Sequence, residues 1–97
     1  MALSYPSMTE GEWNKVVTNR KTFSIAMLKS NYKYFITSVA TGAGAPLAAV
    51  KEYSPRMFDD RSNKFGFSED TAIDFYVWAE DATDSGATIT NTIEVSA

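Results

Sequence analysis

The feature that most constrains the fold of this chain is an alternation of apolar and polar side chains in its last quarter. The alternation runs through residues 72–80 and resumes at 88–95, after a loop rich in Asp, Ser and Gly at 80–87. A period of two residues is typical of a β-strand that buries one face. We therefore predict two strands paired as an antiparallel hairpin. The predicted core-facing side chains are Ile73, Phe75, Val77, Ile89, Ile93 and Val95.

Shorter strand signals precede this unit. Aromatic and β-branched residues predict strands at 22–28 and 32–40, and further short strands at 47–53 and 64–67. Loops or turns are predicted between them at 41–46, 59–63 and 68–71. Short strands at this spacing are typical of small all-β folds. We predict a mainly β chain that forms a small antiparallel β-sandwich or barrel, of which an immunoglobulin-like sandwich is one form.

The first third of the chain contains one helix signal. Thr9 and Glu12 have the spacing of a capping box, which predicts a short helix over about residues 10–20. Gly11 and the Val-Val-Thr run that follows disfavour a helix, so a turn followed by a strand is the alternative. We divide the chain into an N-terminal arm, residues 1–12, and a single β-rich domain, residues 13–97.

Composition excludes several classes of function. The 97 residues are 44% apolar, which is enough for the core of one domain. The sequence contains neither Cys nor His, and this removes the usual zinc ligands, thiol nucleophiles and the Ser-His-Asp triad. The net charge of −3 argues against a nucleic-acid partner. A membrane partner is not expected either, because no apolar run is long enough for a spanning helix and no signal peptide is evident.

Charge is distributed unevenly along the sequence. Residues 1–58 contain seven Lys or Arg and three Asp or Glu, a balance of +4, whereas residues 59–97 contain two and nine, a balance of −7. One interpretation is two solvated faces of a single domain. The other is contact between oppositely charged surfaces of neighbouring molecules in an assembly.

Acidic residues gather in the predicted turns. Adjacent carboxylates such as those at 59–60 and 69–70 are more typical of solvated turns than of a catalytic pair, which the fold must set apart. Glu80, Asp81 and Asp84 are the right ligand type for a weak calcium site, but an acidic turn that resists edge pairing explains them as well. We predict no catalytic, metal-binding or cofactor-binding residue, and no enzymatic activity.

Two groups of residues are candidates for contact with a partner. Tyr76 and Trp78 lie on the polar face of the strand at 72–80, where they either pack under a helix or loop or form an exposed patch for a protein or a sugar. Leu3, Tyr5 and Met8 lie in the predicted arm, which is either a frayed terminus or an extended segment that docks on a neighbouring subunit.

The order of three segments carries a resemblance to a known group of proteins. These segments are the aromatic-rich strand at 32–36, Met-Phe-Asp-Asp-Arg-Ser at 57–62, and Ile-Asp-Phe-Tyr-Val-Trp-Ala at 73–79. Together they resemble small virion proteins of tailed bacteriophages, of the decoration or cement type. The resemblance covers about half of the chain. Asp60 departs from it, because Gly is commoner in that turn.

The resemblance implies a non-enzymatic structural protein that binds the outside of a phage capsid and stabilises it. The implied partners are the major capsid protein and further copies of the chain, as a homo-oligomer such as a trimer. The chain would be made in the host cytoplasm and reside on the capsid surface. The alternative prediction is a β-sandwich binding module that recognises a carbohydrate or a host surface through Tyr76 and Trp78.

Overall fold

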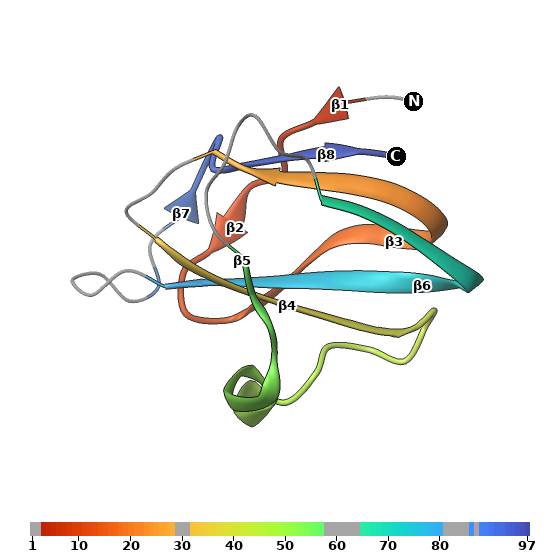
Figure 1. Ribbon diagram of the computed structural model, residues 1–97. Coiled ribbons are helices and arrows are strands. Elements are labelled where there is room, and N and C mark those ends of the chain that lie inside the picture. The colour runs from red at the N-terminus through yellow and green to blue at the C-terminus, as the bar shows by residue number, and fades with distance from the viewer. Residues whose placement is uncertain (1–2, 29–31, 58–64, 81–85, 87) are drawn as a thin grey trace.

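The computed structural model describes residues 3–28, 32–57, 65–80, 86 and 88–97, and it confirms a mainly β, sandwich-like fold (Figure 1). The only helix among the described residues is the short 3-10 helix η1. In chain order the elements are β1 (Leu3–Ser4), β2 (Met8–Thr9), β3 (Trp13–Met27), β4 (Lys33–Ala40), η1 (Ala48–Tyr53), β5 (Arg56–Met57), β6 (Phe65–Glu80), β7 (Thr88–Ile89) and β8 (Ile93–Ser96).

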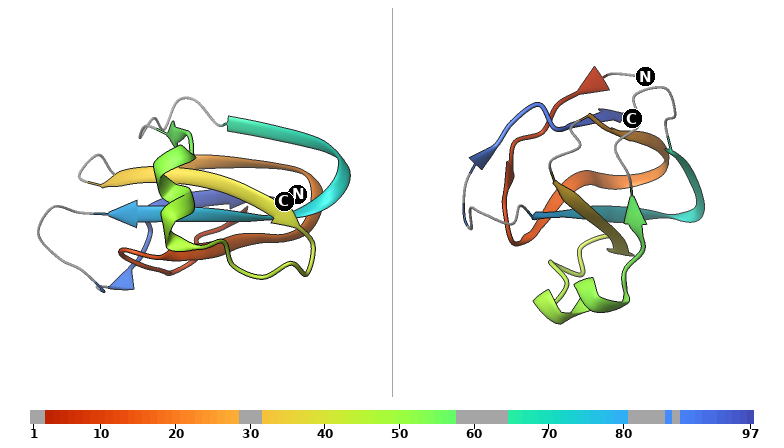
Figure 2. Two further views of the ribbon diagram at one scale, coloured as in Figure 1. Left: turned by 90° about the horizontal axis from the view of Figure 1, so that it is seen from below. Right: turned by 60° about the vertical axis from the view of Figure 1, so that its left-hand side comes forward.

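Two long strands, β3 and β6, build both layers of the sandwich. The larger sheet has the antiparallel order β1-β8-β3-β6-β4-β5, and β2 and β7 form a separate two-stranded sheet. The first half of β3 pairs with the second half of β6, next to β4, while the second half of β3 pairs with the start of β6 and with β8. Both strands curve back on themselves (Figures 1 and 2), so one continuous sheet supplies two facing layers.

The bend in β3 has a local cause. The β3–β6 register shifts three times between Lys15 and Thr22, which marks β-bulges, and Asn19 has a left-handed φ of 53°. Bulges bend a strand and increase its twist. They also interrupt the two-residue period, which explains why the sequence pattern in this region predicts a strand only from residue 22.

The predicted core is confirmed. Phe75, Val77, Ile89, Ile93 and Val95 are buried in one cluster, and Ile73 packs against it. The same cluster contains residues from the other strands, including Phe23, Ile25, Met27 and Tyr34.

The predicted hairpin of residues 72–80 with 88–95 is wrong. Along this half of β6 both edges are already occupied, one by β3 and the other by β4. The run 88–95 is divided by a left-handed residue, Asn91, with a φ of 55°. Its first part, β7, pairs with β2, and its second part, β8, pairs with β3 and β1.

Three other local predictions are also wrong. Residues 10–12 form a turn and β3 follows it, which is the alternative to the predicted helix. Residues 47–53 contain η1 in place of a strand, and residues 65–80 are one continuous strand with no turn at 68–71. In β3, Trp13 and Val17 lie four residues apart as in a helix, but they point into separate clusters on opposite faces of the sheet. The predicted turn at 59–63 lies outside the described residues.

Residues 3–12 do not form a free N-terminal arm. Strand β1 pairs with β8 at one edge of the larger sheet, and β2 pairs with β7. Met8 is buried in the main core cluster, and the hydroxyl of Tyr5 donates a hydrogen bond to Glu94. These residues pack against their own domain, so the division at residue 12 does not separate two structural parts.

Candidate functional site

Tyr76 and Trp78 are buried, and the prediction that they form an exposed patch is wrong. They are 3% and 9% exposed and cluster with Trp13, which lies opposite Trp78 on the neighbouring strand β3. Val50 of η1 packs against this cluster, as do Phe35 and Val39 of β4. The structure therefore has the first of the two predicted arrangements, in which a helix or loop covers the aromatic pair. We call residues 41–54 the cover segment.

One end of the cover segment is held by Glu80. The Glu80 carboxylate accepts hydrogen bonds from Lys51 Nζ at 2.8 Å and from Trp78 Nε1 at 3.0 Å. The Lys51 ammonium also lies 5.2 Å from the centroid of the Trp78 ring, within the range of a cation–π contact. The hydrogen bond from Lys51 is the main reason that the pKa of Glu80 lies below its usual value.

The other end is held by Asp74, a buried carboxylate on the same face of β6 as Tyr76 and Trp78. Its two oxygens accept the backbone N–H groups of Asn19 at 2.9 Å and of Gly42 at 3.2 Å. Lys15 Nζ lies 3.6 Å away. These hydrogen bonds, the one from Asn19 above all, lower the pKa of Asp74. Asp74 thus joins the β3 bend to the start of the cover segment.

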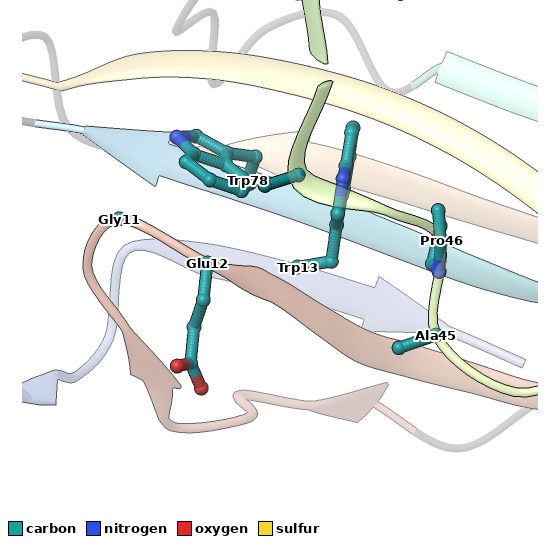
Figure 3. Close-up of a pocket in the computed structure, with 7 residues that line it drawn as sticks. Gly11, Glu12, Trp13, Ala45, Pro46 and Trp78 are labelled. Atoms are coloured by element: carbon teal, nitrogen blue, oxygen red, sulfur yellow. The ribbon is translucent and has the colours of Figure 1, made fainter. Parts of the chain in front are cut away.

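The turn before β3 faces the middle of the cover segment across a pocket. The Asn14 side chain organises this turn by accepting from the Thr9 N–H at 2.8 Å and donating to the Thr9 and Glu12 carbonyls at 3.0 Å and 2.9 Å. The pocket has a volume of about 320 Å³ (Figure 3). It is lined by Gly11, Glu12, Trp13, Ala45, Pro46, Ala48 and Trp78.

The chemistry of this pocket is mainly apolar. The rings of Trp13 and Trp78 meet edge to face, with centroids 5.6 Å apart. Trp13 Nε1 donates to the Leu47 carbonyl at 3.1 Å, and the Trp78 N–H is used by Glu80, so both indoles present carbon surface to the pocket. Figure 3 shows the Glu12 side chain directed away from the two rings. The pocket therefore suits an apolar group better than a sugar, which needs hydrogen-bonding partners.

Most of the large apolar side chains that are exposed among the described residues lie in two places, the cover segment and edge strand β1, and Phe65 at the start of β6, 37% exposed, is the other. Leu47 and Tyr53, on the cover segment, are 78% and 86% exposed. Leu3 and Tyr5, in and just after edge strand β1, are 53% and 48% exposed. In Figure 1 and the right-hand view of Figure 2, β1 and η1 lie on opposite sides of the molecule. Of the predicted contact residues, Leu3 and Tyr5 are therefore accessible to a partner, whereas Met8 is not.

The charge asymmetry of the sequence is partly neutralised within the fold. The described residues form two ion pairs, Lys15 with Asp74 and Lys51 with Glu80. Each joins a basic residue of the first part of the chain to an acidic residue of the second. Among the described residues, no three acidic side chains gather as metal ligands would. Asp81 and Asp84, for which the sequence suggested an acidic turn or a weak calcium site, lie outside the described residues.

Comparisons with protein families, with curated proteins and with solved structures found no match. In the part of the chain that the structure describes, no helix is long and apolar enough to cross a membrane.

Proposed function

We propose that this chain is a non-enzymatic structural protein that decorates the outside of a phage capsid and bridges neighbouring subunits there. The observation that carries the proposal is the pair of exposed apolar ends, one at Leu3 and Tyr5 and the other at Leu47 and Tyr53. Exposed apolar groups of this size are typical of contact surfaces. The resemblance of segments 32–36, 57–62 and 73–79 to decoration proteins supports the capsid as the partner.

The arrangement of the two ends suits a bridging role. A protein that clamps two neighbours needs contact surfaces that face different ways on one body. Here the six-stranded sheet connects them, with β1 at its edge and the cover segment fastened across one face. Because the two ends differ, contact between one end of a copy and the opposite end of the next is heterologous and closes into a ring when the rotation allows. A homo-oligomer such as a trimer on the capsid fits this geometry.

Co-elution with purified expanded capsids in size-exclusion chromatography tests the proposal. Wild-type chain is expected to elute with the capsids. The matched variants Leu47→Ser and Leu3→Ser, one at each end, are each expected to weaken binding by about tenfold, as truncation of a contact residue does. Thr18→Ala, on the exposed part of the β3 bend, is the control and is expected to bind as wild type does. Absence of wild-type chain from the capsid fraction would contradict the proposal.

The burial of the aromatic pair argues against the alternative of a module that binds a carbohydrate or a host surface. That alternative depended on Tyr76 and Trp78 as an exposed stacking surface, and both rings are buried beneath the cover segment.

A further inference from the structure

We propose that the pocket between Trp13 and Pro46 is the recognition site for an extended segment of the partner protein, in which an apolar side chain is flanked by a Lys or Arg. The pocket would take the apolar side chain, and the basic side chain would reach Glu12 beside it. This inference rests on the proposed function, because it names what the cover-segment end of the molecule contacts on the capsid protein.

The apolar half of the inference follows from the pocket walls. Two indole rings, the Pro46 ring and the methyl groups of Ala45 and Ala48 line a space of about 320 Å³. A volume of this order lies at the lower end of the range for small-ligand sites and is ample for one side chain. Leu47 lies between the lining residues Pro46 and Ala48 in sequence and is exposed. Its side chain enlarges the apolar surface that a partner could contact. An aromatic pocket beside an exposed aliphatic residue is the arrangement expected of a binding hot spot.

The basic half of the inference follows from the charges around the pocket. Two basic side chains near this face form ion pairs, Lys15 with Asp74 and Lys51 with Glu80, and a third, Lys33, lies opposite Glu80 on β4 and acts on it through its charge. Glu12 is exposed, and its carboxylate forms no hydrogen bond or ion pair with another described residue. Figure 3 shows the Glu12 side chain pointing away from the two rings. A Lys or Arg of the partner would therefore meet the Glu12 carboxylate outside the apolar pocket and would keep its contact with water. A partner with an adjacent Lys or Arg is complementary to this surface.

The cover segment fixes the geometry of the pocket before any partner arrives. The Trp13 indole is tied to the Leu47 carbonyl, and the Gly11 N–H is tied to the Ala79 carbonyl of β6 at 2.9 Å. The two walls of the pocket, the cover segment and the turn before β3, are therefore both held by β3 and β6. Preorganisation of this kind lowers the ordering cost of binding.

The pocket can be tested with short blocked peptides and the two indole N–H signals of the protein, since the chain has two Trp residues. Acetyl-Leu-Arg-amide is the probe, with acetyl-Leu-Glu-amide and acetyl-Ser-Arg-amide as matched controls. We expect saturable shifts of both indole signals with the Leu-Arg probe. Binding of the Leu-Glu peptide should be about two- to fivefold weaker, as for an exposed charge contact, and that of the Ser-Arg peptide weaker still. In Glu12→Gln the difference between the two Leu peptides should vanish. Indole signals that do not move, or that move equally with the Ser-Arg peptide, would overturn the inference.

A second measurement separates this inference from the proposed function. Ala48→Phe fills the pocket from an exposed position of η1, while Ala49→Phe adds the same ring on the same helix without lining the pocket. The capsid co-elution of Ala48→Phe should fall by about tenfold, and that of Ala49→Phe should not. If wild type and both variants bind capsids equally, the inference fails while the proposed function stands. If the peptides shift the indoles but wild type does not bind capsids, the proposed function fails and the pocket chemistry stands.

Discussion

The contact between Phe67 and Phe75 offers the sharpest test of the bent sheet. The two rings belong to the same strand, β6, and are eight residues apart in sequence. In a straight strand their Cα atoms would lie roughly 26 Å apart, at about 3.3 Å per residue. In the structure the ring centroids are 4.7 Å apart, and Phe23 of β3 lies within 5.2 Å of both. The contact therefore exists only because β6 folds back between its two halves.

A double-mutant cycle with Phe67→Leu and Phe75→Leu measures this contact. Each single variant keeps the core apolar and is expected to lower the free energy of unfolding by about 1 kcal/mol. Because an aromatic pair contributes about 0.5–1.5 kcal/mol beyond the area it buries, we expect the double variant to deviate from additivity by that amount in urea unfolding. The cycle of Phe65→Leu with Phe75→Leu is the control, and it should be additive because no ring contact joins that pair. Additivity of the Phe67–Phe75 cycle to within about 0.5 kcal/mol would mean that the strand does not bend as described.

Three further predictions concern the cover segment and its anchors. The folded-state pKa values of Asp74 and Glu80 lie below those of the unfolded chain. Their stabilising contribution is therefore fully present above about pH 5, where both carboxyl groups are ionised in the unfolded chain as well, and it is lost as the pH falls through the folded values. Urea unfolding from about pH 7 to about pH 2 should show this loss, and a smaller one in Asp74→Asn. Trp13→Phe removes the indole hydrogen bond to the cover segment, which should cost about 1 kcal/mol in urea unfolding; an unchanged midpoint would contradict this role. Gly42→Ala should lower the melting temperature, at a cost of about 1 kcal/mol, because Gly42 has a left-handed φ of 84°. Gly66→Ala is the control and should not lower it, since an added Cβ meets open space at both positions and Gly66 has no left-handed φ.

The core could be predicted from the sequence because it depends on one strand at a time. In β6 the alternation of apolar and polar residues reports which side chains face inward, whatever lies beside the strand. The predicted inward residues Phe75 and Val77 are buried for this reason. Strand pairing could not be predicted in the same way, since it depends on which edges are free. The alternation of residues 88–95 is compatible with any neighbour, and in the fold its first part lies beside β2 and its second part beside β3 and β1, not beside β6.

The bends in the long strands could not be predicted from the sequence for a related reason. A bulge places two successive residues against one partner and so resets the alternation. Between Lys15 and Thr22 the pattern is reset three times, and the result has no clear period. The burial of Met8 was equally hidden, because a single apolar residue between short irregular segments has no periodicity, and only the fold brings it to the core.

The polar face of β6 contains both buried aromatic residues and acidic residues that anchor the cover segment. The alternation of apolar and polar residues alone does not distinguish these two roles. The four alternating members of this face are Asp74, Tyr76, Trp78 and Glu80. The two aromatic residues in the middle are buried, and the two acids at the ends fasten the segment that buries them, through Gly42 at one end and Lys51 at the other. The acids lie six residues apart on the strand, roughly 20 Å, and the cover segment crosses that distance. Because the aromatic face is covered, the exposed apolar surface over this part of the sheet consists of Leu47, Tyr53 and the pocket at the border of the cover segment. The strand pattern that suggested direct contact through Trp78 thus leads instead to the proposal that a partner contacts the segment that Asp74 and Glu80 hold in place.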